Sequence, residues 1–246
     1  RGLGDVYKRQ VKEDLASALP YTEWLAANRI ELDTLRSGRK VENSVKDAGR
    51  RLRIFGYTRE DIERTLTPMC AAGAEPTASM GNDTPLAVLS EKPQSVFNYF
   101  RQQFAQVTNP AIDPIREELV MSLTEYIGAV GSNILSPSAG HCKMVRLPHP
   151  VLTNTQLDIL CNIRYKGFST VKLKMVFKAS DGEEGLRLAI ENLCKSAEEA
   201  VDAGANYIVL SDRDVDAEYA PVPSLIAVSA VHHHLISVPV SYTHLT

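Results

Sequence analysis

The stretch TVKLKMVFKASDGEEGLRLAIENLCKSAEEAVDAGANYIVL, residues 170–210, decides the fold class of this chain. It opens with residues 170–177, where apolar side chains alternate with lysines at the period of a β-strand. Residues 183–203 repeat apolar side chains at three- and four-residue steps, which predicts a helix with one apolar face. Residues 206–210 (NYIVL) predict a second strand. Because a long helix between two strands lets them run parallel, the stretch predicts a right-handed parallel βαβ unit.

Particular side chains carry this prediction. The strand period depends on Val171, Leu173 and Met175. Gly204 suits a left-handed residue that ends the helix, and residues 223–236 predict a further helix after the second strand. The apolar face of the long helix comprises Leu186, Ile190, Leu193, Ala197, Ala200 and Val201. The chain is therefore assigned to the α/β class, with parallel βαβ units as its architecture.

Upstream of this unit the sequence predicts shorter elements. Residues 11–27 form a short strand or helix that ends an earlier domain, and residues 33–53, rich in both signs of charge, form a solvated linker. A helix starts at an N-cap on Thr58 and ends at Pro68. Residues 73–85, dense in Gly, Pro, Asn, Asp and Thr, form an ordered loop.

The middle of the chain predicts two helices and a loop. One helix begins at Pro93, and its aromatic and apolar stripe is expected in the core. The next helix begins at Asp113-Pro114 and runs to Leu123, and residues 136–150, with three prolines, form a loop. The stripe of the first helix consists of Phe97, Phe100, Phe104 and Val107.

Composition narrows the function classes. The chain has 246 residues, is 44% hydrophobic and has a net charge of −3, so it offers no positive excess for nucleic acid or a membrane surface. No apolar run approaches the length of a membrane span, and no signal-peptide pattern opens the chain. The four cysteines are widely spaced, and we expect reduced, mostly buried thiols: Cys70, Cys142, Cys161 and Cys194.

Both ends of the sequence look foreign to the rest. Residues 1–10 (RGLGDVYKRQ) have no helical or strand period that joins them to residues 11–27, and residues 237–246 stop a helical segment abruptly. Both resemble translated sequencing-adapter sequence, and we exclude them from the expected fold. The alternative is that they are genuine frayed termini.

The carboxyl end of the second strand offers the first candidate site. Ser211, Asp212 and Arg213 lie where catalytic or phosphate-binding loops gather in parallel sheets, although a charged turn that satisfies helix ends explains them equally well. The acidic spacing of the same loop resembles a calcium loop but lacks its central glycine and its bidentate glutamate. The acidic residues are Asp212, Asp214, Asp216 and Glu218.

Other candidates also favour a structural role. His232, His233 and His234 are consecutive, so on a helix they point in different directions and cannot share one metal ion. His141 and Cys142 are a potential base and nucleophile, but sequence neighbours rarely face each other.

The glycines of the 73–85 loop are candidates for a phosphate-binding loop. Gly73 and Gly81 match neither the Walker nor the dinucleotide spacing. We therefore assign no catalytic, cofactor-binding or metal-binding residue in this chain.

A family resemblance goes further than these patterns. Residues 75–123, EPTASMGNDTPLAVLSEKPQSVFNYFRQQFAQVTNPAIDPIREELVMSL, closely resemble the central domain of the glutamate synthase large subunit. FGYTREDIERTLTPM at 55–69, LPHPVLTNTQL at 147–157 and PSLIAVSAVHHHLI at 223–236 agree with it. PYTEWL at 20–25 resembles the end of that family's glutaminase domain. The resemblance therefore covers nearly all of the chain between the two foreign-looking ends.

The resemblance implies a function for the parent protein. Glutamate synthase makes two glutamates from glutamine and 2-oxoglutarate, with electrons from ferredoxin or NAD(P)H. It implies FMN and an iron–sulfur cluster elsewhere in the parent and none in this part. Its partners are the glutaminase and FMN domains of the same chain, with ferredoxin or a small NADPH-dependent subunit, and its location is the bacterial cytoplasm or the plastid stroma.

For this part, the resemblance implies a central domain without catalysis that helps to form an ammonia tunnel. Its fold resembles half of a flavin-binding barrel without flavin. The expected division is the end of the glutaminase domain and a linker over residues 11–50, and an incomplete central domain over 51–236. The alternative is a small independent α/β enzyme that acts on a phosphorylated metabolite through the loop at 211–213.

Overall fold

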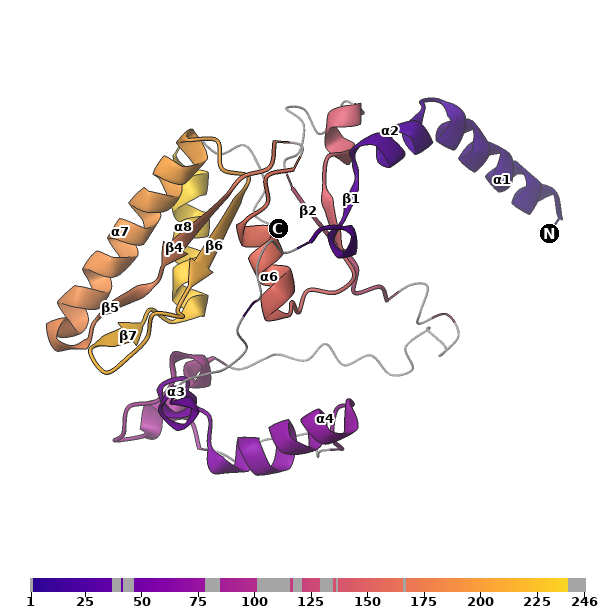
Figure 1. Cartoon of the computed structure of the whole chain (residues 1–246). Helices are drawn as coiled ribbons and strands as arrows, with labels where there is room; N and C mark the ends of the chain where they lie inside the picture. Colours follow the sequence, from indigo (N-terminus) through magenta and orange to yellow (C-terminus); the bar gives the residue numbers. More distant parts are fainter. Residues whose placement is uncertain are drawn as a thin grey trace.

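The computed structural model has a mixed α/β architecture, in which helices pack on small sheets (Figure 1). The residues that the structure describes are 2–36, 41, 47–77, 85–100, 116, 121–128, 135, 137–165 and 167–238. Over these ranges the strands form one three-stranded and two two-stranded sheets, and no closed barrel. Nor does any helix within them combine the length and the apolar character needed to cross a bilayer.

The predicted βαβ unit is present. Strand β4 (Thr170–Lys174) pairs in parallel with β6 (Tyr207–Ser211), and helix α7 (Gly182–Asp202) connects them. Helix α8 (Ser224–Ser237) follows and packs beside α7. Gly204 ends α7 at a φ of +81°, the left-handed conformation that the sequence predicted. The central fold prediction is thus confirmed.

The core of this unit is built by the predicted helical face. Ala197 is fully buried and Leu193 is 4% exposed, and both belong to one buried cluster with side chains of α8. Each large apolar side chain buried in this way stabilises the fold by about 1.5–3 kcal/mol. The buried members of this cluster, the βαβ core, are Met175, Leu193, Cys194, Ala197, Val222, Ala227, Val231 and Leu235.

The first predicted strand is interrupted at Met175. The chain leaves β4 at Lys174 and continues as β5 (Val176–Lys178), which pairs antiparallel with β7 (Tyr219–Pro221). The amide of Met175 donates to the carbonyl of Ser211 (2.9 Å), and its own carbonyl accepts from Val222 (2.9 Å). Met175 therefore moves the chain from one strand partner to the next, so a single strand over 170–177 was wrong.

A second sheet joins distant parts of the chain. Its order is β1-β3-β2, formed by β1 (Ile30–Glu31), β3 (Val145–Leu147) and β2 (Glu125–Ile127). Strand β1 runs parallel to β3, and β2 runs antiparallel to it. The buried cluster beneath, the second core, contains Ile30, Leu32, Val145, Leu147, Leu160, Ile163 and Phe168.

The loop expected over residues 136–150 was therefore wrong in part. It contains the 3₁₀ turn η5 (Ala139–Cys142) and strand β3, whose Val145 and Leu147 are buried on either side of Arg146. Three residues suffice for β3, because the strands β1 and β2 on either side of it supply hydrogen bonds. The prolines around it favoured a loop, so the short alternation of apolar and charged residues over 145–147 was not recognised as a strand.

The N-terminal region is helical. Helix α1 (Gly2–Ser17) runs without a break through residues 10 and 11, and helix α2 (Tyr21–Asn28) follows. The sequence shows no period that joins residues 1–10 to residues 11–27, but one helix runs through both, and pairs of side chains one turn apart support it. These pairs are Arg9 with Glu13 (3.6 Å) and Gln10 with Asp14 (2.9 Å). After β1 the chain makes one 3₁₀ turn, η1 (Leu32–Thr34).

The helix expected from Thr58 to Pro68 begins as predicted and ends later. The hydroxyl of Thr58 accepts from the Asp61 amide (3.1 Å), while the Asp61 carboxylate accepts from the Thr58 amide (2.7 Å). The wider π-helical turn η2 (Asp61–Leu66) precedes α4 (Thr67–Ala72), which ends at Gly73. The chain stays helical through Leu66 and Thr67, and Pro68 lies where the wider π-helical turn passes into α4, so the predicted stop at Pro68 was wrong.

The helix predicted from Pro93 is reduced to one turn in the described residues. Residues 93–95 are irregular, and η4 (Val96–Tyr99) is a single 3₁₀ turn. Phe97 is 51% exposed and Phe100 is 65% exposed, so their expected place in the core was wrong. Phe104, Val107 and residues 113–115 lie outside the described residues.

Short helices complete the described structure. Helix α3 (Ala48–Ile54) occupies part of the predicted charged linker. Helix α6 (Asn154–Cys161) starts at a capping box between Thr153 and Gln156. The turns η3 (Ala87–Leu89) and η6 (Ala179–Asp181) precede η4 and α7, respectively.

Cysteine burial differs from the expectation. No disulfide joins any of the four cysteines, all of which lie in described parts of the chain; Cys70 is exposed and only Cys194 is buried. Burial raises the pKa of the Cys194 thiol, because the charged thiolate loses solvation.

Gly128 offers a test of the second sheet. Its φ is +149°, and a Cβ there would lie 3.0 Å from the Lys143 carbonyl oxygen and 3.1 Å from the Phe168 ring. We expect Gly128→Ala to lower the free energy of unfolding by about 1–3 kcal/mol through overpacking and backbone strain. Chemical denaturation measures this loss. Gly140→Ala is the control, because its Cβ would meet Ser138 Oγ only at 3.5 Å, and an equal effect of both substitutions would contradict the packing described.

Candidate functional site

The candidate loop predicted at 211–213 lies at the carboxyl ends of β4 and β6. The parallel pairing places Ser211 opposite Lys174 at this edge, and Ser211 is 6% exposed. Its carbonyl accepts from Met175, and its hydroxyl lies 3.4 Å from the amide of Arg213. The buried serine is thus engaged in holding the loop. We refer to residues 211–216 as the junction loop.

Arg213 links the junction loop to two helices, α6 and α3. Its Nη2 donates to Asn154 Oδ1 at the start of α6 (2.8 Å). Its carbonyl oxygen accepts from Arg51 Nη2 of α3 (3.2 Å), although the two residues are far apart in sequence. The guanidinium is therefore committed to α6, and the backbone beside it to α3. This arrangement favours the structural interpretation of the loop over phosphate binding.

Two acidic residues of the junction loop, Asp214 and Asp216, have separate partners. Asp214 pairs with Lys174 of β4 (3.0 Å). Asp216 accepts from the amides of Glu218 (2.8 Å) and Tyr219 (2.9 Å), which turns the chain into β7. These amides, and more weakly Arg50, lower the pKa of the Asp216 carboxyl because they stabilise its charged form. Within the described ranges, no three His, Cys, Asp or Glu side chains gather as a metal site.

A small hollow of about 190 Å³ lies between α3 and the junction loop. Its charged lining is paired internally, since Arg50 contacts Asp47 at 2.9 Å and Asp216 caps the turn. A second hollow of about 320 Å³ lies between the end of η1 and α6, where Asn162 donates to Asp158 (3.0 Å). The polar groups named here already bind one another.

The predicted histidine candidates occupy structural positions. His234 Nε2 lies 2.8 Å from Glu198 Oε2, so this pair links α8 to α7. The rings of His232 and His233 meet edge to face, with centroids 5.2 Å apart. His141 Nδ1 accepts from the amide of Ser138 (3.2 Å) and caps η5. Its Nε2 is buried and has no hydrogen-bond partner within the described residues.

Tyr207 is a residue that the sequence analysis did not single out. Its ring stacks on Phe168 with centroids 5.4 Å apart, and its hydroxyl donates to the carbonyl of Ile127 in β2 (3.1 Å). Burial raises its pKa, which keeps the hydroxyl protonated as a donor. Because Tyr207 starts β6, it connects the βαβ unit to the second sheet. The only sequence signal was an amphipathic aromatic residue at the start of the NYIVL strand.

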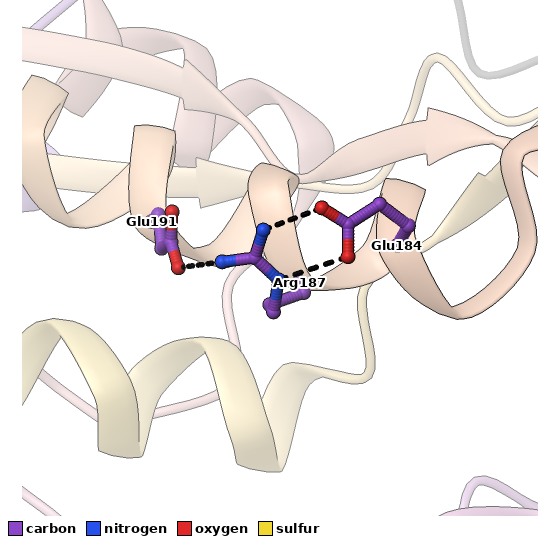
Figure 2. Close-up of polar contacts among 3 residues, drawn as sticks. All are labelled: Glu184, Arg187 and Glu191. Carbon is purple, nitrogen blue, oxygen red and sulfur yellow. Dashed lines mark hydrogen bonds and ion pairs between the residues drawn. The ribbon is translucent and has the colours of Figure 1, made fainter.

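The outer face of α7 carries an ion-pair fork. Arg187 contacts Glu184 and Glu191, which lie one helical turn away on either side (Figure 2). The hydrogen bond and charge of Glu184 raise the pKa of Arg187, and Arg187 lowers the pKa of Glu184. All three side chains are exposed, and such pairs stabilise a helix only slightly. The fork therefore supports α7 and does not form a binding site.

Comparison with known proteins identifies the family. Residues 50–242 match the family model described as "Glutamate synthase central domain", which covers the βαβ unit, the junction loop and strands β2 and β3. The chain belongs to the glutamate synthase central-domain family. The resemblance seen in the sequence is confirmed, and no observation supports the alternative enzyme acting on a phosphorylated metabolite.

Three relatives illustrate the similarity. The chain is 41% identical over 227 residues to the glutamate synthase [NADPH] large chain of Bacillus subtilis (strain 168), covering 92% of this chain and 14% of that protein. It is 40% identical over 235 residues to ferredoxin-dependent glutamate synthase 2 of Synechocystis sp., covering 92% and 15%. It is 42% identical over 239 residues to the chloroplastic ferredoxin-dependent glutamate synthase of Spinacia oleracea, covering 95% and 14%. The chain thus spans about one seventh of the length of these relatives.

The junction loop has a testable pH dependence. Because the folded-state pKa of Asp216 lies below its ordinary value, its carboxylate stabilises the fold above about pH 4. This contribution is lost as the pH falls through the folded-state pKa. We expect Asp216→Ala to lower the denaturation midpoint at pH 7, and the difference from the unsubstituted chain to narrow on acidification. Asp202→Ala, at the end of α7, is the matched control; a difference that does not change with pH would contradict the capping role.

Proposed function

We propose that this chain is the central part of a glutamate synthase large chain, a connecting domain without reacting groups of its own. The family match carries this proposal. The junction loop supports it, because Arg213 and Asp216 at the carboxyl edge of the parallel sheet serve the protein's own structure. The parent protein would make two glutamates from glutamine and 2-oxoglutarate.

The connecting role has a physical purpose. Ammonia released from glutamine becomes protonated and diffuses away in bulk water, so a sequestered path to the site of reduction prevents its loss. We propose that this domain joins the glutaminase and FMN domains of the same chain and helps to form that path. The two buried cores, which Tyr207 links, are consistent with a rigid spacer between the glutaminase and FMN domains.

We also propose that the central domain resembles a flavin-binding barrel in fold. A parallel strand pair with its connecting helix α7 and the following helix α8 is the repeating arrangement from which such barrels are built. We propose that the central domain, of which this unit is a part, corresponds to half of such a barrel and binds no flavin. The finer division, a glutaminase end and linker over 11–50 and the central domain over 51–236, is also part of this proposal.

Cofactors and partners belong to the parent protein in this proposal. FMN and an iron–sulfur cluster would lie outside this chain, and ferredoxin or a small NADPH-dependent subunit would supply electrons. Relatives named as bacterial and as chloroplastic support the cytoplasm or the plastid stroma as the location.

The proposal predicts that the chain alone is inactive. Purified chain incubated with glutamine releases no glutamate above the buffer blank, and titration with FMN gives no saturable change in flavin fluorescence. The physical reason is that the Arg213 and Asp214 side chains already bind α6 and β4, and the Arg213 carbonyl already binds α3. Glutamine hydrolysis, or FMN binding at one equivalent, would contradict the proposal. A circular dichroism spectrum with helix and strand signals, as the structure requires, serves as the folding control.

A further inference from the structure

A short segment before the family match forms an edge strand of the second sheet. Residues 29–35, which we call the strap, contain strand β1, paired in parallel with β3 in the register Ile30 to Val145 and Glu31 to Arg146. The amide of Ile30 donates to the carbonyl of Met144 (2.9 Å). The family match begins at residue 50, so β1 lies outside it while β3 lies inside. One sheet thus contains strands from both sides of the residue where the family match begins.

The strap also completes the second core. Ile30 is 3% exposed and Leu32 is 1% exposed, and both pack with Val145, Leu160 and Phe168. A solvated linker leaves its side chains in water, whereas these two are as buried as residues in the middle of a sheet. Removing them from the second core would expose apolar surface on the elements that remain.

One carboxylate holds the strap beside its partner strand. Glu31 lies between two arginines, with Arg29 Nε at 3.0 Å and Arg146 Nη1 at 3.1 Å. The three side chains are between 34% and 38% exposed, so solvent screens these pairs only in part. Because Arg146 is the residue opposite Glu31 in the register, the ion pair fixes which residues of β1 and β3 face each other.

The strap continues directly from a helix that packs on the same region. Helix α2 contacts the turn η5, which leads into β3. The amide of Arg29 donates to the carbonyl of Leu25 (2.9 Å), so the helix end and the strap are continuous. The chain's single tryptophan, Trp24, lies on α2 and meets Tyr21 edge to face at 5.6 Å. The position of α2 against η5 therefore depends on the strap, which holds the carboxyl-terminal end of α2.

We infer that residues 29–35 are a fixed joint that belongs to the central domain, and that Glu31 is its positioning residue. The joint sets the orientation of α2, and of the polypeptide before it, relative to the sheet. Its use as a connection between domains rests on the proposed function, but the joint itself does not. Residues 33–35 of the predicted solvated linker belong to this joint: Asp33 and Thr34 remain exposed, and Leu35 packs against the second core.

The test uses charge reversal in the full chain. In Glu31→Arg, three arginines meet at one place, and we expect hydrogen exchange at the amides of residues 30–32 and 144–147 to become faster by on the order of fivefold. The double variant Glu31→Arg/Arg146→Glu restores the pair and should recover most of the protection. Glu199→Arg, on the exposed face of α7, is the matched control and should leave these amides unchanged.

Trp24 gives a second readout that tests positioning. Acrylamide quenching of its fluorescence should increase in Glu31→Arg, because α2 loosens from η5, and should return toward its starting value in the double variant. Exchange in α7 should stay the same in every variant, which shows that the βαβ unit remains folded.

Each outcome bears on a different part of the inference. If Glu31→Arg and Glu199→Arg show the same hydrogen exchange and the same acrylamide quenching, residues 29–35 are not a fixed joint. If the double variant does not recover the protection of these amides, the pair of Glu31 and Arg146 does not position the strap. Both measurements are made on the chain itself and involve no glutamine or flavin. If the exchange results confirm the joint but the chain hydrolyses glutamine, the proposed function is rejected and this inference remains valid.

Discussion

The parallel pairing of β4 with β6 is the constraint on which the rest of the structure depends. Parallel neighbours need a crossover, and α7 supplies it while covering the strands with its apolar face. The same pairing brings the carboxyl ends of both strands together, so Met175 and Ser211 meet there and the junction loop begins. That loop then receives α3 through Arg51 and α6 through Asn154. A single strand pair thus determines the positions of α7, α3 and α6.

The second sheet is attached to this unit by few, specific contacts. Tyr207 belongs to β6 yet stacks on Phe168 of the second core and donates to Ile127. A half-buried phenol that makes both contacts is more specific than apolar packing, because the hydroxyl loses its partner if the sheet shifts. The strap attaches to the far side of the same sheet through Glu31. The sheet therefore lies between the βαβ unit and the upstream helices.

Periodicity predicted the regular parts of the fold and little of the connections. The apolar face of α7 and the turn at Gly204 follow from local sequence, because one periodic pattern and one left-handed residue determine them. The break at Met175 and the strand at Val145 depend on partners far away in sequence, which no local pattern contains. For the candidate site, the sequence located the junction loop, but only the structure gives Arg213 and Asp216 their partners.

As proposed, this chain is a rigid connector whose polar groups maintain its own structure. The most direct test places residues 20–236 in the matched position of the Bacillus subtilis large chain and measures glutamate formed and ammonia released for each glutamine consumed. We expect the glutamate yield of the parent enzyme with no free ammonia, since the connector brings its sheets and joint intact. Glutamine consumption with ammonia released into solution and no gain in glutamate would contradict the proposal.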